Sequence, residues 1–525
     1  ILGIIGIVFM VKRDWKMAIA IAVLFFSTGL IFNVYGNQPP IEPRERDYVL
    51  SGSLFAYAFF IGMSVISMYK ALKDKFNPNV SVVIAFGIAF VGPFLMGFNG
   101  WDDHNRGGRS TAIDFASNYL NSCEPNAIIF TQGDNDTYPL WYAQEVEGVR
   151  TDVRVINLSL LGVDWYINQL RYKMNDADPV KITFTPEMLR AGNRDVVNYI
   201  QNPNLDKNKY YNAQQIMYFI SQDDEKIEAV YNAGYYLPTK KLAFPIDREA
   251  AVEIGLMKAD DSTSLNQINL DLKKNSLYKY DLLTLDIVAN NINERPIYFA
   301  VSVSPSSFMG FQKYFEQHGL TYRIVPRVNP SNQPTQSPVN AERMYENLMT
   351  KFKWGMLDTN PKAYVDENIG RMTLNLVSNF VRLAEQLNKE GEHEKAIEVL
   401  DKCIQVLPAN KVHYNFFHAE IPKEYLEAGQ NEKAKAFAEK VLLSAQAELD
   451  YYVLVYNDKI ERVREYSPGL LPQYQAGLFT QNRSVMEQLY LLQQMSTAFQ
   501  QSNEREMSEE LQTVLDKYSV ALKQI

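Results

Sequence analysis

The chain has 525 residues, a net charge of −9 and 46% hydrophobic residues, so it is long enough for about two to four domains with a sizeable core. No basic block accompanies this acidic balance, which argues against nucleic acid as the main partner. Cys123 and Cys403 lie far apart, which excludes a disulfide framework and a cysteine-based metal site. Roughly the first hundred residues are almost continuously apolar, whereas the remainder has the mixed composition of a soluble protein.

Apolar runs in this first part predict membrane-spanning helices. Residues 1–11 resemble the end of a span, and fuller candidates follow at 17–34, 49–69 and 80–98. Each of these three is close to the length of about 20 residues that crosses a bilayer core. Because the chain begins inside an apolar run, we expect it to be the carboxyl-terminal part of a longer membrane protein, with the lipid bilayer as its first partner.

Basic residues predict the orientation of these spans. The two short loops between spans contain Lys12, Arg13, Lys16, Lys70, Lys73 and Lys75. Short loops rich in Lys and Arg stay in the cytoplasm. We therefore expect the loop 37–48 and everything after Asn99 on the other side, which in a bacterium is the periplasmic side of the inner membrane.

The outward loop 37–48 reads NQPPIEPRERDY and is stiffened by its prolines. Arg44 and Arg46 place two guanidinium groups near the headgroup level, next to Glu42. One interpretation is a rigid loop whose charges pair internally. The other is a fork that grips the phosphate of a lipid-linked donor, because a guanidinium can donate two hydrogen bonds to one phosphate. Glu42, Arg44 and Arg46 are candidate substrate-binding residues.

A polar cluster follows the last span and consists of Asp102, Asp103, His104, Arg106 and Arg109. Neighbouring Asp and His side chains can bind a metal or act as acid and base. The alternative is a solvated junction with internal ion pairs. Just beyond the cluster, Ser110 or Thr111 is expected to cap a helix over residues 113–120.

Residues 126–161 carry the clearest pattern of local structure. The apolar run 127–130 predicts a buried strand that ends at the sequence GDND. Asp136 or Thr137 is expected to cap the next helix, with Pro139 in its first turn and Gly148 at its end. The β-branched run 153–161 then predicts a second strand, which gives the order of a βαβ unit.

Asp134, Asn135 and Asp136 therefore fall at the carboxyl end of a strand, where open α/β sheets bind ligands. An Asp-x-Asp pair can hold a divalent cation on a nucleotide sugar. Nucleotide sugars belong to the cytoplasm, however, and the predicted orientation places this loop outside. We expect the three residues to form a side-chain-capped structural hub that faces the acceptor, without a metal.

The later part of the outward domain is less patterned. Strands are expected at 241–246, 295–303 and 322–325, and an amphipathic helix at 282–291. The rest of 183–280 is expected to form helices and loops that decorate the sheet. Residues 329–338, reading NPSNQPTQSP, predict a linker.

A helical pattern follows the linker. The large, small and terminating positions of a tetratricopeptide repeat are occupied by Phe380, Leu383, Ala384, Leu387, Gly391, Ala396, Leu400, Cys403 and Pro408. A looser copy contains Tyr425, Gly429, Ala434, Ala438 and Val441, and helices are expected over 484–525. Such an array either binds a partner or caps the preceding domain.

Together these patterns predict a multi-domain fold. Transmembrane helices occupy residues 1–99, an α/β domain with a partly parallel sheet occupies 100–335, and an all-α tetratricopeptide-like tail occupies 336–525.

Four motifs resemble a large family of bacteroidete membrane proteins: NQPPIEPRERDY, WDDHNRGGRSTAIDFASNYLNSC, GDNDTYPLWYAQEVEGVRTDVRVINLSLL and RPIYFA. That family is similar to the protein O-mannosyltransferase-like glycosyltransferases of family 117, formerly a domain of unknown function, in the multispan C-type superfamily. In the family pattern an acidic residue commonly follows the His, whereas this chain has Asn105. This departure weakens a metal or acid–base role for the cluster around His104.

The resemblance implies a membrane enzyme that transfers a sugar, with mannose as the first expectation, from a polyprenyl-phosphate carrier to Ser or Thr of exported proteins. It implies no cofactor besides this donor. Its catalytic carboxylate is expected in an early outward loop, outside the present residues, so the catalytic residues here are unknown and this chain alone is expected to be inactive. The alternative function is a non-enzymatic, membrane-anchored scaffold whose helical tail recruits envelope proteins.

Overall fold

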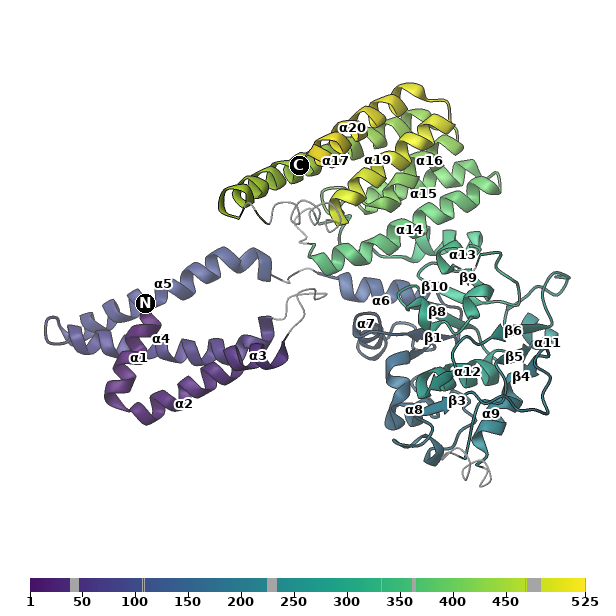
Figure 1. The fold of residues 1–525 in the computed structure, drawn as a ribbon, viewed down its shortest axis with the longest axis horizontal. Helices are drawn as coiled ribbons and strands as arrows, with labels where there is room; N and C mark the ends of the chain where they lie inside the picture. The colour runs from purple at the N-terminus through teal and green to yellow at the C-terminus, as the bar shows by residue number, and fades with distance from the viewer. Residues whose placement is uncertain are drawn as a thin grey trace. The chain divides into compact units, whose positions relative to one another are not determined.

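The computed structural model describes residues 1–37, 47–105, 107, 109–223, 234–331, 333–360, 365–467, 469 and 483–524. The chain forms two compact units, Ile1–Gly107 and Gly108–Ile525 (Figure 1). The boundaries predicted within the second unit stay predictions.

The described residues of the first unit are almost all helical. Its helices are α1 (Leu2–Arg13), α2 (Trp15–Phe26), α3 (Phe32–Gly36), α4 (Ser51–Leu72) and α5 (Pro78–His104), with a π-helical turn, Ser27–Ile31, joining α2 to α3. Three stretches, Trp15–Gly36, Tyr48–Leu72 and Pro78–Trp101, are long and apolar enough to cross a membrane. The three fuller spans expected from the sequence are thus confirmed as membrane-type helices.

Small residues let the helices of the first unit pack closely. A Cβ atom on Gly6 of α1 would lie 1.7 Å from the carbonyl oxygen of Phe60 on α4. A Cβ atom on Gly29 would lie 2.6 Å from the hydroxyl of Ser53, which itself donates a hydrogen bond of 2.9 Å to the carbonyl of Phe25. Lipid tails provide no hydrophobic force between helices, so close backbone approach supplies the packing energy instead.

We expect Gly6→Ala to destabilise the packing of α1 on α4 by about 1–3 kcal/mol, because the new methyl group would overlap the Phe60 backbone. Gly62→Ala is the matched control, since among the described residues a Cβ there meets no atom within 4 Å. The measurement is the temperature at which a cysteine placed at the buried Ala56 becomes reactive in the full chain in mild detergent. Equal temperatures for the two variants would contradict this account.

The second unit is built around a five-stranded sheet in the order β2-β1-β8-β10-β9. The strands are β1 (Ile128–Thr131), β2 (Arg154–Asn157), β8 (Ile297–Ala300), β9 (Phe315–Gln317) and β10 (Thr321–Ile324). β1 pairs in parallel with β2 and β8, whereas β10 pairs antiparallel with β8 and β9. Every residue of these strands is buried. The partly parallel sheet and its βαβ unit are therefore confirmed, and β9 is an additional strand that the sequence did not reveal.

Helix α7 (Asp134–Glu145) connects β1 to β2 and begins earlier than predicted. Gly133 is its N-cap, and Asp136 lies in its first turn, where the carboxylate accepts the backbone N–H of Gly133 at 2.7 Å. Asp136 thus accepts backbone N–H groups at the helix start, as predicted, although the N-cap position itself is Gly133. Pro139 was expected in the first turn but lies beyond it. Gly148 follows the helix with a φ of +65°, as the predicted termination requires.

Strand β2 is shorter than the run 153–161. The Asn157 side chain accepts the backbone N–H of Leu160 at 3.0 Å, and the chain turns there into a 3₁₀ helix, η3 (Leu158–Gly162). Helix α8 (Asp164–Leu170) follows, and α6 (Thr111–Asn121) precedes β1 as expected. Ser110 is the N-cap residue of α6, but its hydroxyl donates to Asp114 at 2.6 Å rather than capping the backbone.

Residues 183–280 contain more strands than the single one predicted there. β3 (Val196–Asn198) pairs with β7 (Ser276–Tyr278), and β5 (Lys241–Pro245) pairs with β4 (Tyr211–Asn212) and β6 (Gln267–Asp271). Helices α9 (Ala213–Ser221) and α11 (Arg248–Glu253) accompany them. Most of these strands are very short and pair across long gaps in sequence, so local periodicity does not reveal them.

Helix α12 (Lys279–Asn291) covers the predicted 282–291 but is not amphipathic. It is buried on nearly all sides, including the carboxylates of Asp281 and Asp286. Asp281 pairs with Lys274 at 2.7 Å, and Asp286 accepts the backbone N–H of Thr183 at 2.8 Å. Polar residues of α12 therefore face internal partners rather than solvent.

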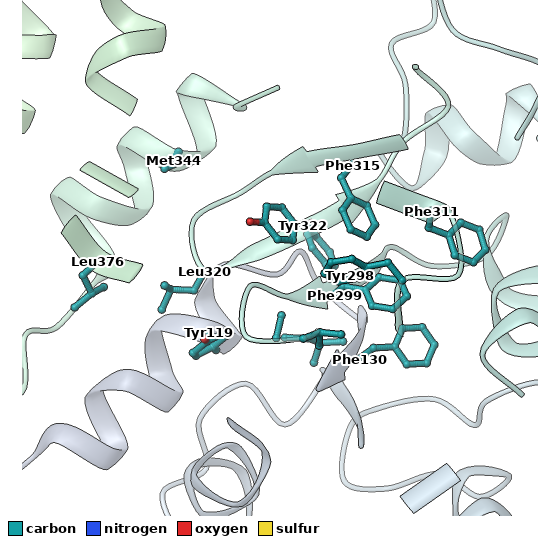
Figure 2. Close-up of a cluster of buried hydrophobic side chains, with 14 of the residues drawn as sticks. Tyr119, Phe130, Tyr298, Phe299, Phe311, Phe315, Leu320, Tyr322, Met344 and Leu376 are labelled. Carbon is teal, nitrogen blue, oxygen red and sulfur yellow. The ribbon is translucent and has the colours of Figure 1, made fainter. Parts of the chain in front are cut away.

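Aromatic side chains fill one face of the main sheet (Figure 2). The ring centroids of Phe130 and Phe299 lie 4.9 Å apart, and those of Phe299 and Phe315 lie 5.4 Å apart. Tyr322 stacks on Phe315 at 5.3 Å. Because these residues come from β1, β8, β9 and β10, their packing stabilises the contact between the antiparallel strands β9 and β10 and the parallel strands β1 and β8.

Further helices in the described part of the second unit are α13 (Ala341–Glu346), α14 (Glu367–Lys389), α15 (His393–Val406), α16 (Glu420–Glu427), α17 (Asn431–Tyr466), α19 (Arg483–Gln501) and α20 (Arg505–Gln524), stacked as in Figure 1. This confirms the all-helical tail. The large and small repeat positions of its first copy are buried, and Gly391 and Gly429 take φ values of +79° and +73° between helices. The tetratricopeptide assignment itself stays a prediction.

The predicted linker is packed against both of its neighbours. The side chain of Arg382 on α14 donates to the carbonyl of Ser337, and the backbone N–H of Gln317 on β9 donates to the carbonyl of Pro338 at 2.8 Å. Trp354 stacks on Phe380 at 5.3 Å. One continuous apolar core therefore runs from the sheet into the helices.

His418, between α15 and α16, is buried and its ring lies 5.2 Å from that of Tyr414. Burial lowers the pKa of His418 from 6.5 to about 4. Between pH 6.5 and about pH 4 the unfolded chain binds this proton more strongly than the folded chain does. The free energy of unfolding therefore falls as pH falls, by at most about 1.4 kcal/mol per pH unit.

His418→Gln should lack this contribution to the pH dependence of the free energy of unfolding. Urea unfolding of the full chain from pH 7 to about pH 4 measures the difference. Identical slopes for both proteins would refute the assignment.

Candidate functional site

A cleft of about 780 Å³ opens among α6, α7 and α14 in the second unit. Its lining combines charged, amide and aromatic side chains: Arg109, Thr111, Ala112, Phe115, Tyr119, Asp134, Asn135, Asp136, Tyr138, Pro139, Tyr142, Ser302, Asn368, Ile369, Arg371, Met372 and Asn375. This volume falls within the range of ordinary ligand pockets.

The floor of the cleft is built at the carboxyl ends of the parallel strands. Asp136, after β1, accepts hydrogen bonds from the backbone N–H groups of Gly133 at 2.7 Å and Gln132 at 3.3 Å, and from the hydroxyl of Ser302 at 2.6 Å. Ser302 follows β8, the strand next to β1. One carboxylate therefore ties two strand ends to the start of α7.

The end of β2 joins the same network. The Asn157 amide donates to the Thr137 hydroxyl at 2.9 Å, and Thr137 shares a 2.7 Å hydrogen bond with Thr131 at the end of β1. These three side chains are buried. The polar groups at the ends of three strands are thus paired internally, which holds the floor in one geometry.

Helix α6 forms one wall and is fixed by distant residues. The Asn118 amide donates to the carbonyl of Lys353 at 2.8 Å, and the Lys353 N–H donates back to the Asn118 side chain at 2.9 Å. Asp114 accepts the N–H of Gly355 at 3.1 Å. Gly355 has a φ of +64° and packs directly on Thr111, so a side chain there would strain both segments.

Helix α14 forms the opposite wall. Its residues in the cleft are Asn368, Ile369, Arg371, Met372 and Asn375, which lie on one face of the helix. Asp366 caps this helix by accepting the N–H of Ile369 at 3.0 Å, and it also lies 3.8 Å from the guanidinium of Arg109. The charge of Arg109 is therefore partly balanced by the helix cap.

Tyrosines give the cleft an aromatic side. Tyr138 and Tyr142 lie one turn apart on α7 and expose 50% and 43% of their surface, enough for a ligand to stack on them. Tyr142 donates to Glu147 at 2.5 Å, and this hydrogen bond raises the pKa of its hydroxyl. Burial raises the pKa of Tyr119 well above its ordinary value, although its hydrogen bond with Ser302 lowers it. Tyr119 and Tyr142 therefore stay neutral at physiological pH.

This arrangement offers polar, charged and aromatic groups that can bind a ligand. The hydrogen bonds of Asp136 engage both of its carboxylate oxygens, which leaves it poorly placed to act as a base. Among the described residues, no group of three or more His, Cys, Asp or Glu side chains is placed to hold a metal ion. The cleft instead offers both signs of charge, several amides and apolar side chains on its α6 and α14 walls.

The structure brings together four of the predicted site residues, namely Arg109, Asp134, Asn135 and Asp136. His104 lies at the end of α5 in the first unit, where its ring nitrogen Nδ1 is 2.8 Å from the carbonyl of Gly100. Asp102 and Asp103 lie on the same helix, but their side chains are outside the described part of the chain. Glu42, Arg44, Arg46 and Arg106 are likewise outside it. The substrate-binding role of all of them stays a prediction.

Sequence reasoning missed several residues that line the cleft: Ser302, the α14 residues, Thr111, Ala112, Phe115 and Tyr119 of α6, and Tyr138, Pro139 and Tyr142 of α7. Ser302 lies inside the predicted strand 295–303, whereas the observed strand β8 ends at Ala300. With the correct strand end, the rule that selected the GDND loop would also have selected Ser302. The α14 residues carry no such signal, because the apolar pattern of that helix marks residues buried in the core, such as Leu376 and Phe380. Only the folded chain places Asn368 and Asn375 opposite α7.

Comparison with known proteins adds one match. Residues 112–343 match the family model described as TMEM260-associated domain 2. The matched range holds the motif blocks 133–161 and 295–300 and all of the cleft except Arg109, Thr111 and α14. No curated protein and no solved structure gives a significant match to the chain.

We expect Asp136→Ala to lower the free energy of unfolding by about 1–3 kcal/mol, because it leaves the capping and strand-end donors without their acceptor. Asp134→Ala, two residues away and exposed, should cost less than about 1 kcal/mol, the usual size of a helix-dipole effect. Urea unfolding of the two full-chain variants measures the difference. An equal decrease in the free energy of unfolding for both variants would contradict the structural role of Asp136.

Proposed function

We propose that this chain is part of a membrane glycosyltransferase that transfers a sugar from a polyprenyl-phosphate carrier to Ser or Thr of exported proteins, with mannose as the expected sugar. In this proposal the protein lies in a bacterial inner membrane, and the second unit faces the periplasm. The second unit positions substrate, and the catalytic carboxylate lies outside the present residues.

One combination carries the proposal: three membrane-type helices precede a domain that matches the TMEM260-associated model. Two of the motifs that resemble the protein O-mannosyltransferase-like glycosyltransferases lie inside that match. The mixed polar and aromatic cleft of the same domain supports a substrate-binding role. Its position at the carboxyl ends of parallel strands is where α/β proteins generally bind ligands.

A scaffold for envelope proteins is the second candidate, and α17 favours it. This helix is 36 residues long and exposes Leu443, Tyr451 and Leu454, whose spacings of eight and three residues place them on one face of the helix. A contiguous exposed apolar patch is a feature of partner-binding surfaces. The two candidate functions predict different results of gene deletion: loss of sugar from exported glycoproteins for the glycosyltransferase, and unchanged glycoproteins for the scaffold.

Deleting the whole gene should remove the sugar mass and the lectin binding of exported glycoproteins, as measured by mass spectrometry and lectin blotting. Re-expression of the intact gene should restore both. Asp134→Asn should restore them only partly, because it changes the charge of the cleft. The matched control is Asp458→Asn on α17, an exposed aspartate outside the cleft, which should restore them fully.

Unchanged glycoproteins after deletion would refute the glycosyltransferase proposal. If cross-linking to α17 then captured a stable envelope partner, the scaffold function would replace it.

A further inference from the structure

We propose that the cleft among α6, α7 and α14 binds an extended, polyproline-II-like segment of the acceptor polypeptide through its backbone. This inference rests on the proposed function and names the substrate that the second unit holds. The proposed ligand of the cleft is a peptide, and not the sugar or the phosphate of the carrier.

The spacing of two amides on α14 carries the argument. Asn368 and Asn375 line the cleft seven positions apart, which places them about 10 Å apart along the helix axis. In a polyproline II helix, positions three residues apart face the same side and are separated by about 9 Å. The two asparagines therefore match successive same-side peptide groups of such a segment.

The chemistry of the side chains agrees with a peptide ligand. An asparagine amide both donates and accepts hydrogen bonds, so it can pair with a peptide carbonyl and with a peptide N–H. The half-exposed rings of Tyr138 and Tyr142 stand on the other wall. Aromatic-lined grooves are the usual recognition surface for polyproline II segments.

The balance of charge disfavours a phosphate ligand. The lining holds Arg109 and Arg371 together with Asp134 and Asp136, and Asp366 lies 3.8 Å from Arg109. Carboxylates on two sides of a cleft repel a phosphodiester, whereas a neutral peptide backbone is unaffected. Apolar residues of the α6 and α14 walls, namely Phe115, Ile369 and Met372, suit the side chains of a polypeptide.

The test measures binding of a dye-labelled peptide of repeated Thr, Ala and Pro to the full chain in detergent, by fluorescence anisotropy. The double variant Asn368→Ala, Asn375→Ala should bind this peptide about tenfold more weakly, the effect of losing one or two hydrogen bonds. Asn457→Ala, which makes the same change at an exposed position of α17, should bind like the parent protein. A peptide N-methylated at its Thr and Ala residues should also bind more weakly, since it lacks the backbone donors.

Several results would overturn the proposal. These are no measurable peptide binding by the parent protein, equal binding by the double variant and the parent, equal binding of the N-methylated peptide, or displacement of the peptide by free mannose or by inorganic phosphate. Circular dichroism of each variant verifies that it is folded. Because peptide binding is measured without sugar transfer, it can fail while the glycoprotein phenotype of the deletion stands, and the reverse can also occur.

Discussion

The carboxylate of Asp136 is the contact around which the second unit is organised. It accepts two backbone N–H groups at the start of α7 and the hydroxyl of Ser302 after β8. Parallel strands with two buried faces leave their polar ends close together, and each buried polar group needs a partner. Asp136, with the neighbouring Asn157 and Thr137, meets this need and so fixes the floor of the cleft.

The rest of the cleft follows from how the helical tail is attached. The aromatic core of the sheet continues through Trp354 and Phe380 into α14, so the tail is part of the same core rather than a loosely attached module. This continuity presents Asn368 and Asn375 opposite α7. A helix of the tail thereby supplies one wall of a site whose floor belongs to the sheet.

Each of the two units is stabilised internally by a different interaction. In the membrane-type helices, glycines such as Gly6 permit backbone contact where no hydrophobic force acts between helices. In the second unit, burial of apolar side chains dominates, and α12 shows that even carboxylates are drawn inside when internal donors such as Lys274 and Thr183 are available. The same chain thus uses backbone proximity in one unit and a large apolar core in the other.

The sequence by itself determined the membrane-type helices, the βαβ unit with GDND at the carboxyl end of its first strand, and the all-helical tail, because each depends on local periodicity and on turn residues. It did not reveal the short strands β3, β4, β6, β7 and β9, whose pairing partners lie far away in sequence. It placed Arg109 and Asp134 to Asp136 among the site residues, but not the α14 wall. Only the tertiary structure determined that α14 lines the cleft. Residues more than two hundred positions apart meet there through core packing, which no local sequence pattern encodes.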